Sequence, residues 1–534
     1  MRTKIKVNTG LLVAILALGW LLAACPARGA TLYVNAASAA PAAPYDTWDN
    51  AAKVIQDAID AASSGDEIVV TNGVYATGGR LLYGLTTNRV AVVGPITLRS
   101  VNGPQVTIIR GAQVPGTTNG ATALRGVYLT DGAVLSGFTV TNGATAVGEP
   151  GGGVFCDSTA GIVTNCIITG NAADSAGGGA ESGTLYNCTL NNNTAPTGGG
   201  ASDGALIGCT LAGNKAVEGG GAYSASLTNC TLRSNLAGYG GGASGSTLQQ
   251  CVVSTNSAGD GAGAYYCSVY NSAFSGNAST GEGGGSYDGM LINCTVTGNS
   301  SATSGGGSAY GTLENCIIYY NTAPAGGANV WGGSATLNYC CTTPMPTNGV
   351  GHITNAPLFI NSLAGNLRLQ TNSPCINVGS NALVSGTADL DGRPRIVSSK
   401  VDLGAYEFQP GVSGVFIAWL AQYGLPTDGS ADYTDPDHDG LNDWQEWVCQ
   451  TNPTNALSAL GLVAVAPVGT KTTLTWQSVA GVNYYLQWRT NLAAASPFVL
   501  LATNLAGQSG FTSYTQTSAV HLPRQFYRVG VPVP

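Results

Sequence analysis

Short apolar segments alternate with turns rich in Gly and Asn at a fixed spacing between about residues 130 and 330. The Gly-rich runs begin at 177, 198, 219, 240, 261, 283, 305 and 326, so the repeat is 21 or 22 residues long. Helical solenoids need about 33 to 45 residues and two helices per repeat, which Gly-rich units of this length cannot supply. Segments such as CIIT and CTVT therefore predict a parallel β-helix whose coils stack about 4.8 Å apart.

A column of Cys follows the same repeat. Its members are Cys166, Cys188, Cys209, Cys230, Cys251, Cys294 and Cys316, with Ser272 and Phe138 in equivalent positions. Neighbouring Cα atoms in such a column lie within disulfide range, but the Cβ vectors run parallel instead of converging. Metal binding is disfavoured because no paired Cys spacing accompanies the column. The pattern predicts buried, reduced thiols that pack as small apolar groups.

A second column consists of Asn residues, each of which follows an apolar residue and two variable ones. They are Asn171, Asn193, Asn214, Asn235, Asn256, Asn277, Asn299 and Asn321. Stacked Asn side chains hydrogen-bond along cross-β columns, so we expect an amide ladder here. We also expect these residues to occupy the left-handed backbone of a corner, which Asn tolerates.

The flanking segments complete the predicted architecture. TLYVN (31–35) predicts a first strand, and the apolar spacing in AAKVIQDAIDAA predicts a cap helix near 51–62. Alternating segments such as TTLTWQSV and NYYLQWRT predict a small C-terminal β-sandwich over 459–534. The predicted fold is mainly β: a right-handed parallel β-helix over 30–408, a helix-loop-helix calcium linker over 409–458, and the sandwich.

Three stretches resemble known families of exported bacterial proteins. The GGGA and apolar-x-x-Asn pairs resemble repeats of polymorphic outer-membrane proteins. SPCINVG (373–379) and DLDGRPRIVSSKVDLGAYEF (389–408) resemble the closing segment of β-helix proteins of the "choice-of-anchor" type. The C-terminal strands resemble fibronectin type III-like modules. These resemblances imply a surface or secreted protein. The partner we expect is an extracellular polysaccharide or a cell-surface ligand.

Composition and the N-terminus agree with export. The net charge is −8 and only 9% of residues are charged, so nothing favours nucleic acid as a partner. Basic residues precede the apolar run 11–24, which is typical of a signal peptide over 1–29. Two cleavage sites remain open: LAAC places a lipid-modified Cys25 at the start, whereas cleavage before Ala30 releases an unmodified chain. We expect a monomer that is extracellular or associated with the outer membrane, by lipid if Cys25 is used.

Residues 435–446, DPDHDGLNDWQE, match the twelve-residue calcium-loop pattern. Asp435, Asp437 and Asp439 would supply oxygen ligands, Leu441 its carbonyl, Asp443 a direct or water-mediated contact, and Glu446 a bidentate carboxylate. Gly440 would permit the sharp turn. Hard oxygen ligands favour Ca²⁺; the competing interpretation is an acidic turn without metal. The segment resembles thrombospondin type 3 and dockerin-like calcium repeats.

Catalytic chemistry has few candidates in the coils. Glu218, Asp260 and Glu282 precede Gly runs, and Lys215 and Arg233 are the only basic residues between 150 and 330. If Asp260 and Glu282 stack, they match a retaining glycosidase pair, but equally a solvated acidic edge or weak calcium binding. We therefore expect a non-catalytic adhesion or polysaccharide-binding protein; the alternative is a carbohydrate-active enzyme, either a lyase or a glycoside hydrolase.

Overall fold

The computed structural model describes residues 29–532, except 83, 371, 398–399, 410–412, 427–430, 432–433, 469–470, 490–497 and 517–524. Cys25 and the predicted signal peptide, apart from Gly29, lie outside the described residues. The chain forms two compact units. The first contains the residues up to Pro357 together with Pro374–Glu407, and the second contains Leu358–Ser373 and the chain from Phe408 onward.

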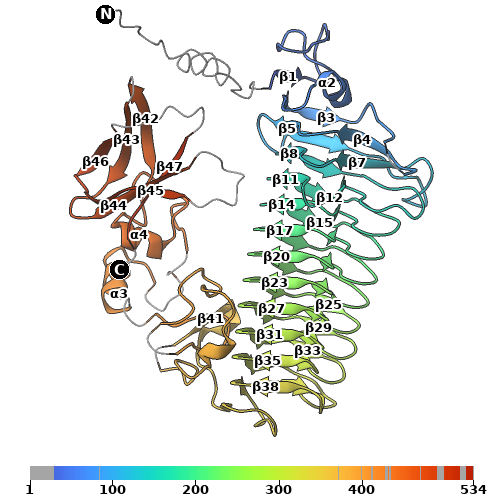
Figure 1. Cartoon of the computed structure of the whole chain (residues 1–534). Helices are drawn as coiled ribbons and strands as arrows, with labels where there is room; N and C mark the ends of the chain where they lie inside the picture. Colours follow the sequence, from blue (N-terminus) through green and yellow to red (C-terminus); the bar gives the residue numbers. More distant parts are fainter. Residues whose placement is uncertain are drawn as a thin grey trace, which may run out of the picture. The chain divides into compact units, whose positions relative to one another are not determined.

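The first unit is a right-handed parallel β-helix, which confirms the predicted fold class. Three sheets run along it, and each coil adds one strand to each sheet in most of the stack. Figure 1 shows the coils stacked in chain order from β1 to β38, with the colour changing from blue to yellow. Sheet A has thirteen strands, in this order: β1 (Thr31–Val34), β2 (Glu67–Val70), β5 (Thr97–Ser100), β8 (Val134–Ser136), β11 (Ile162–Thr164), β14 (Thr184–Tyr186), β17 (Ala205–Ile207), β20 (Ser226–Thr228), β23 (Thr247–Gln249), β27 (Ser268–Tyr270), β31 (Met290–Ile292), β35 (Thr312–Glu314) and β38 (Thr336–Asn338).

The other two long sheets have the same parallel pairing. Sheet B comprises β3 (Gly73–Tyr75), β6 (Thr107–Arg110), β9 (Thr139–Thr141), β12 (Ile167–Thr169), β15 (Thr189–Asn191), β18 (Thr210–Ala212), β21 (Thr231–Arg233), β24 (Val252–Ser254), β28 (Ala273–Ser275), β32 (Thr295–Thr297), β36 (Ile317–Tyr319) and β39 (Cys341–Thr342). Sheet C comprises β4 (Thr87–Val92), β7 (Leu124–Leu129), β10 (Val154–Cys156), β13 (Ala180–Glu181), β16 (Ala201–Ser202), β19 (Ala222–Tyr223), β22 (Ala243–Ser244), β26 (Ala264–Tyr265), β30 (Ser286–Tyr287), β34 (Ser308–Ala309) and β37 (Val330–Trp331). A short fourth sheet comprises β25 (Ser257–Ala258), β29 (Ala278–Ser279) and β33 (Ser300–Ser301).

The interior of the coils combines large and small side chains. Sheets A and B point Leu, Val, Ile and Phe inward, as Leu227 and Leu232 do in one coil, whereas sheet C contributes Ala222 at the same level. The Gly runs lie beside sheet C, where coils approach most closely. A Cβ on Gly221 would lie 2.4 Å from the carbonyl oxygen of Gly242, so no larger residue fits. Gly219, with φ of +67°, supplies the left-handed turn before it.

The Cys column is confirmed as a stack of free, buried thiols. Several members accept a backbone N–H from the preceding coil: Cys209 N donates to Cys230 Sγ at 3.4 Å, and Cys251 N donates to Ser272 Oγ at 2.9 Å. Cys230 Sγ in turn lies 3.4 Å from the carbonyl oxygen of Leu206. The Ser in the column therefore makes the same hydrogen bond as the thiols.

The Asn ladder is also confirmed, but its backbone prediction was wrong. The Nδ2 of Asn235 donates to Oδ1 of Asn256 and to the Leu211 carbonyl, both at 3.0 Å. The left-handed conformation belongs to the residue just before each ladder Asn, as in Ser234 with φ of 55° and Thr255 with φ of 54°. The ladder side chain has to point inward to reach its neighbours, so the preceding residue makes the turn.

Residues 380–389 run back along the outside of the last coils, and residues up to Ala405 return, since Gly404 donates its N–H to the Asn315 carbonyl and Ala405 donates its N–H to Thr295. Asn315 bonds the carbonyl of Ser380, Asn271 that of Ser385, and Gln250 that of Asp389. Farther along, buried Arg395 donates to the carbonyls of Asp402 and Gly404. At the other end, helix α2 (Ile55–Ala61) packs Ile55 and Ile59 against the first strands. Residues 374–407 also contain the short 3₁₀ turn η2 (Asn381–Leu383).

The second unit contains small antiparallel sheets and two helices. A hairpin of β40 (Phe359–Asn361) and β41 (Asn366–Leu369) encloses η1 (Ser362–Ala364). One three-stranded sheet comprises β42 (Leu462–Val468), β43 (Lys471–Ser478) and β46 (Gly510–Gln516); the other comprises β45 (Val499–Ala506), β44 (Asn483–Arg489) and β47 (Phe526–Gly530). Trp476 and Tyr484 fill their shared core. The helices are α3 (Ser413–Gln422) and α4 (Asp443–Cys449). None of the helices among the described residues has the length and apolar character needed to cross a bilayer.

Candidate functional site

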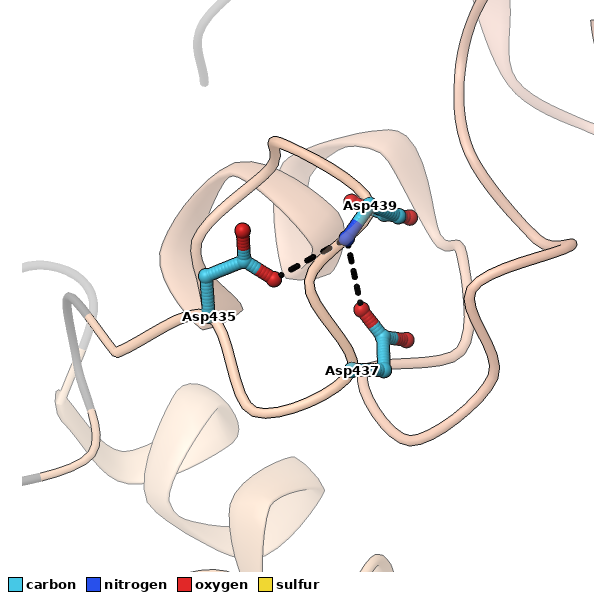
Figure 2. Close-up of side chains that lie close together, drawn as sticks. All are labelled: Asp435, Asp437 and Asp439. Atoms are coloured by element: carbon cyan, nitrogen blue, oxygen red, sulfur yellow. Dashed lines mark hydrogen bonds between the residues drawn. The ribbon is translucent and has the colours of Figure 1, made fainter. Parts of the chain in front are cut away.

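Three carboxylates converge in the loop before α4. One oxygen from each of Asp435, Asp437 and Asp439 lies within 4.8 Å of the others, an arrangement that can hold a metal ion. Figure 2 shows the side chains of Asp435 and Asp437 on either side of the Asp439 backbone nitrogen. Left-handed turns at His438, with φ of 63°, and Gly440, with φ of 93°, curl the backbone around them.

Backbone N–H groups hold the loop in this shape. The N–H of Asp439 donates to Asp435 at 3.2 Å and to Asp437 at 3.3 Å, and that of Gly440 donates to Asp435 at 3.0 Å. Leu441 donates its N–H to Asp439 at 2.7 Å. The carbonyl role expected of Leu441 stays a prediction. These bonds orient the three carboxylates as a group, which we call the Asp triad.

Helix α4 adds two more acidic groups. Asn442 caps its start, since its side chain accepts from the Gln445 N–H and the Gln445 side chain accepts in return. Asp443 and Glu446 follow in the first turn, and both are fully buried. Thr434 donates to Asp443 at 3.3 Å, and Thr451 donates to Glu446 at 3.2 Å.

Several carboxylate oxygens in this region are buried without a hydrogen-bond partner. They include one oxygen of each of Asp437, Asp439 and Glu446. Burial raises the pKa of Glu446 to about 8, and the charges of Asp437 and Asp439 add to the effect. Burial likewise raises the pKa of Asp439. A bound cation would satisfy these oxygens and offset their mutual repulsion, so the residues present fit a metal ion with hard oxygen ligands.

The acidic candidates in the coils share one column but not one cluster. Backbone bridges link Glu218 to Tyr239 and Tyr239 to Asp260, so a full coil separates Glu218 from Asp260. Asp260 and Glu282 lie on adjacent coils, and the N–H of Glu282 donates to Asp260 at 2.7 Å. Glu218 instead accepts from Ser244 at 2.8 Å. Only Asp260 and Glu282 are therefore brought together.

The two basic candidates lie elsewhere. Arg233 is exposed at the end of β21 in sheet B. Lys215 forms backbone bridges with Thr194 and Leu236 and lines an open hollow together with Asn119 and other polar residues. Neither residue lies in a strand of sheet C. In the chain, the strands of sheet C come a few residues after the acidic column.

A group of tyrosines was missed by the reasoning from sequence. Tyr239, Tyr265, Tyr266, Tyr287 and Tyr310 make ring contacts with one another across four successive coils. We call this group the tyrosine cluster. Apart from Tyr239, each follows a Gly run by a few residues, as in GAGAYY and GGGSY. Aligning the positions after the Gly runs would therefore have revealed most of the cluster.

No protein-family model matches the chain, and no curated protein matches it. Solved structures similar to it include pectate lyase Pel9A, at 16% identity and a TM-score of 0.42, covering 71% of this chain and 96% of that one. A rhamnogalacturonan lyase has 14% identity, a TM-score of 0.35, and coverage of 75% and 100%. XylC in complex with xylose has 9% identity, a TM-score of 0.36, and coverage of 70% and 98%. At these values the likenesses assign neither an activity nor a substrate to this chain.

Proposed function

We propose that this protein is an exported or surface-attached β-helix protein that binds extracellular polysaccharide without cleaving it. The observation that carries the proposal is the distribution of reactive side chains over the coils. Elimination chemistry on uronates needs a strong base and cations, yet Lys215 and Arg233 are the only basic residues between 150 and 330, and they belong to different columns: Arg233 ends β21 of sheet B, whereas Lys215 forms bridges with Thr194 and Leu236. The regular ladders of the coils support a rigid, extended binding scaffold.

The proposal that the protein is exported or attached to the cell surface rests on sequence resemblance. The repeats resemble those of polymorphic outer-membrane proteins, and 373–408 resembles the closing segment of proteins of the choice-of-anchor type. We propose accordingly that the chain is monomeric and either secreted or held at the outer membrane, by a lipid if Cys25 is the cleavage site.

We further propose that Ca²⁺ binds the Asp triad with help from Glu446. The support is the set of buried carboxylate oxygens that have no hydrogen-bond partner. Ca²⁺ takes six to eight oxygen ligands. It also accepts several carboxylates more readily than Mg²⁺ does, so the acidic residues of the loop favour Ca²⁺. Binding would stiffen the segment between α3 and α4, and calorimetric titration with Ca²⁺ at millimolar concentration tests it.

One observation favours the alternative of a carbohydrate-active enzyme. Asp260 and Glu282 lie on adjacent coils, and the rise of about 4.8 Å between coils is compatible with the carboxyl separation of about 5–5.5 Å in a retaining glycosidase. Incubation with a panel of polysaccharides, followed by reducing-end and unsaturated-uronate assays, separates the two functions. Binding without products supports the proposal. Turnover that Asp260→Ala or Glu282→Ala abolishes would replace it with the enzyme.

A further inference from the structure

The tyrosine cluster forms a continuous aromatic surface on sheet C. Tyr265 of β26 and Tyr287 of β30 are register partners, and their rings stack with centroids 5.2 Å apart. Tyr266 meets both rings edge-on, at 4.6 and 5.9 Å. Tyr239 and Tyr310 extend the row at its two ends, at 5.3 and 5.5 Å from their neighbours. The row therefore runs along the axis of the coils.

The backbone of Tyr266 has a conformation that is unusual for a bulky residue. Its backbone is left-handed, with φ of 51°, and so is that of Tyr310, with φ of 59°. The same column holds Ser224, Gly245 and Asp288 in other coils, which are smaller residues suited to such turns. Left-handed backbone costs a bulky residue about 1 kcal/mol. Yet 53% of Tyr266 remains exposed, so burial gives little in return.

Tyrosines placed in this way are typical of binding surfaces. A Tyr ring offers a rigid apolar face together with a hydroxyl, and ordering it on binding fixes only two side-chain torsions. Tyr239 and Tyr266 are the most exposed members, at 43% and 53%. Exposed ring faces pack against the C–H faces of sugar rings, while the hydroxyls and nearby carboxylates hydrogen-bond to sugar hydroxyls.

The charges beside the tyrosine cluster restrict the chemical class of ligand that can bind there. Asp260 and Glu282 belong to the adjoining column, and their charges act on Tyr265 and Tyr287. Burial, neighbouring tyrosines and Asp260 raise the pKa of Tyr265 to about 12, so its hydroxyl keeps its proton at neutral pH. The only basic residues of coils 150–330 are Lys215 and Arg233, which lie outside the strands of sheet C.

We propose that the tyrosine cluster, with Asp260 and Glu282, is the site where this protein binds an uncharged polysaccharide. A polyuronate would bring its carboxylates against those of Asp260 and Glu282 with no cation beside them to neutralise the repulsion. A neutral chain meets only acceptors for its hydroxyls and rings for its apolar faces. The inference rests on the proposed function and adds the site and the chemical class of the ligand.

The test is affinity electrophoresis of the full chain in native gels that contain hydroxyethylcellulose, xyloglucan, galactomannan, polygalacturonate or alginate. Tyr239→Ala and Tyr266→Ala remove the two most exposed rings. Tyr320→Ala is the matched control, because Tyr320 has φ of 60° and 52% exposure but lies after β36 of sheet B. All three variants keep the coil interior intact, and far-UV circular dichroism checks this.

We expect at least one neutral polysaccharide to retard the protein, with affinity at least tenfold weaker for Tyr239→Ala and Tyr266→Ala and unchanged for Tyr320→Ala. Equal retardation of all variants would overturn the site and leave the proposed function standing. Tighter binding to polygalacturonate or alginate would overturn the ligand class. Retardation by none of the five polymers would overturn both this inference and the proposed polysaccharide binding.

Discussion

In the coils, the buried amide of Asn235 uses both its donor and its acceptor on neighbouring coils. In the acidic loop, Asp437, Asp439 and Glu446 each have a buried oxygen without a hydrogen-bond partner. The Asn column satisfies its polar groups because each coil carries the partner that the next one needs, whereas the buried side-chain amide of Asn293, elsewhere in the coils, has no hydrogen-bond partner. A single loop has no second copy of itself, and its unpartnered carboxylate oxygens belong to a group that could hold a metal ion. The Asn ladder therefore stabilises the coils, whereas the loop is a candidate binding site.

The strongest way to break the comparison is to remove one rung of the ladder. Asn235→Ala takes the acceptor away from two N–H donors of Asn214 and the donor away from the Leu211 carbonyl. Each buried group left unsatisfied costs about 1–3 kcal/mol. We expect the free energy of unfolding to fall by about 3 kcal/mol, measured by urea denaturation.

Asn229→Gly serves as the control for that experiment. Asn229 is exposed and left-handed, with φ of 54°, so Gly adopts its backbone without strain. Its effect should stay within about 0.5 kcal/mol. If the two variants lost equal stability, the hydrogen bonds of the Asn ladder would not be what makes the buried column matter more for stability than the surface.

The loop is tested by neutralising its buried helix carboxylate. Glu446→Gln keeps neutral at every pH a group whose charged form burial and the Asp triad disfavour, so the metal-free protein should resist proteolysis near residue 440 at least as well as the original. With Ca²⁺ present, the original protein should resist proteolysis better than the Glu446→Gln variant. A ligand at one hundred times its Kd stabilises the original by about 2.7 kcal/mol, and the variant should lose most of this gain.

Glu218→Gln is the matched acidic control, since Glu218 lies in the coils and should leave the response to Ca²⁺ unchanged. Differential scanning calorimetry with and without Ca²⁺ measures both variants. A Glu446→Gln protein that responds to Ca²⁺ like the original would remove Glu446 from the site.

The pH dependence sharpens the same contrast. The folded state raises the pKa of Glu446 to about 8, so it holds the proton more tightly than the unfolded chain does. The resulting stabilisation is complete below the ordinary pKa of Glu and disappears as the pH rises through about 8. In a chelator, the loop should be cut by protease faster at pH 8.5 than at pH 5. Added Ca²⁺ should slow the cut at pH 8.5 most. Equal cutting rates at both pH values in chelator would contradict the buried state of Glu446.

Most of the repeated features of the structure could be predicted from the sequence, whereas features that occur only once could be predicted less completely. A period of 21 or 22 residues was enough to predict the coils, and equivalent positions were enough to predict the Asn and Cys columns. The position of the left-handed turns was missed although Gly occupies it in four coils, as in Gly170 and Gly213, because residues such as Thr255 and Tyr320 occupy it in others. In the loop, the spacing of Asp435, Asp437 and Asp439 predicted the triad. The burial of Glu446 depends on how α4 packs, which the spacing does not encode.

The smallest effect is expected where the column already tolerates exchange. Cys230→Ser should cost less than about 1.5 kcal/mol, because Ser272 makes the equivalent hydrogen bond to Cys251 in the same column. The accompanying measurement is a thiol titration. The thiols of the column are buried in the folded protein, where a reagent in solution does not reach them. The folded protein should therefore react slowly with a thiol reagent, and the denatured protein should expose about one thiol per column Cys. Quantitative disulfides in the column, or a loss from Cys230→Ser as large as that from Asn235→Ala, would mean that the thiols do more than pack between coils.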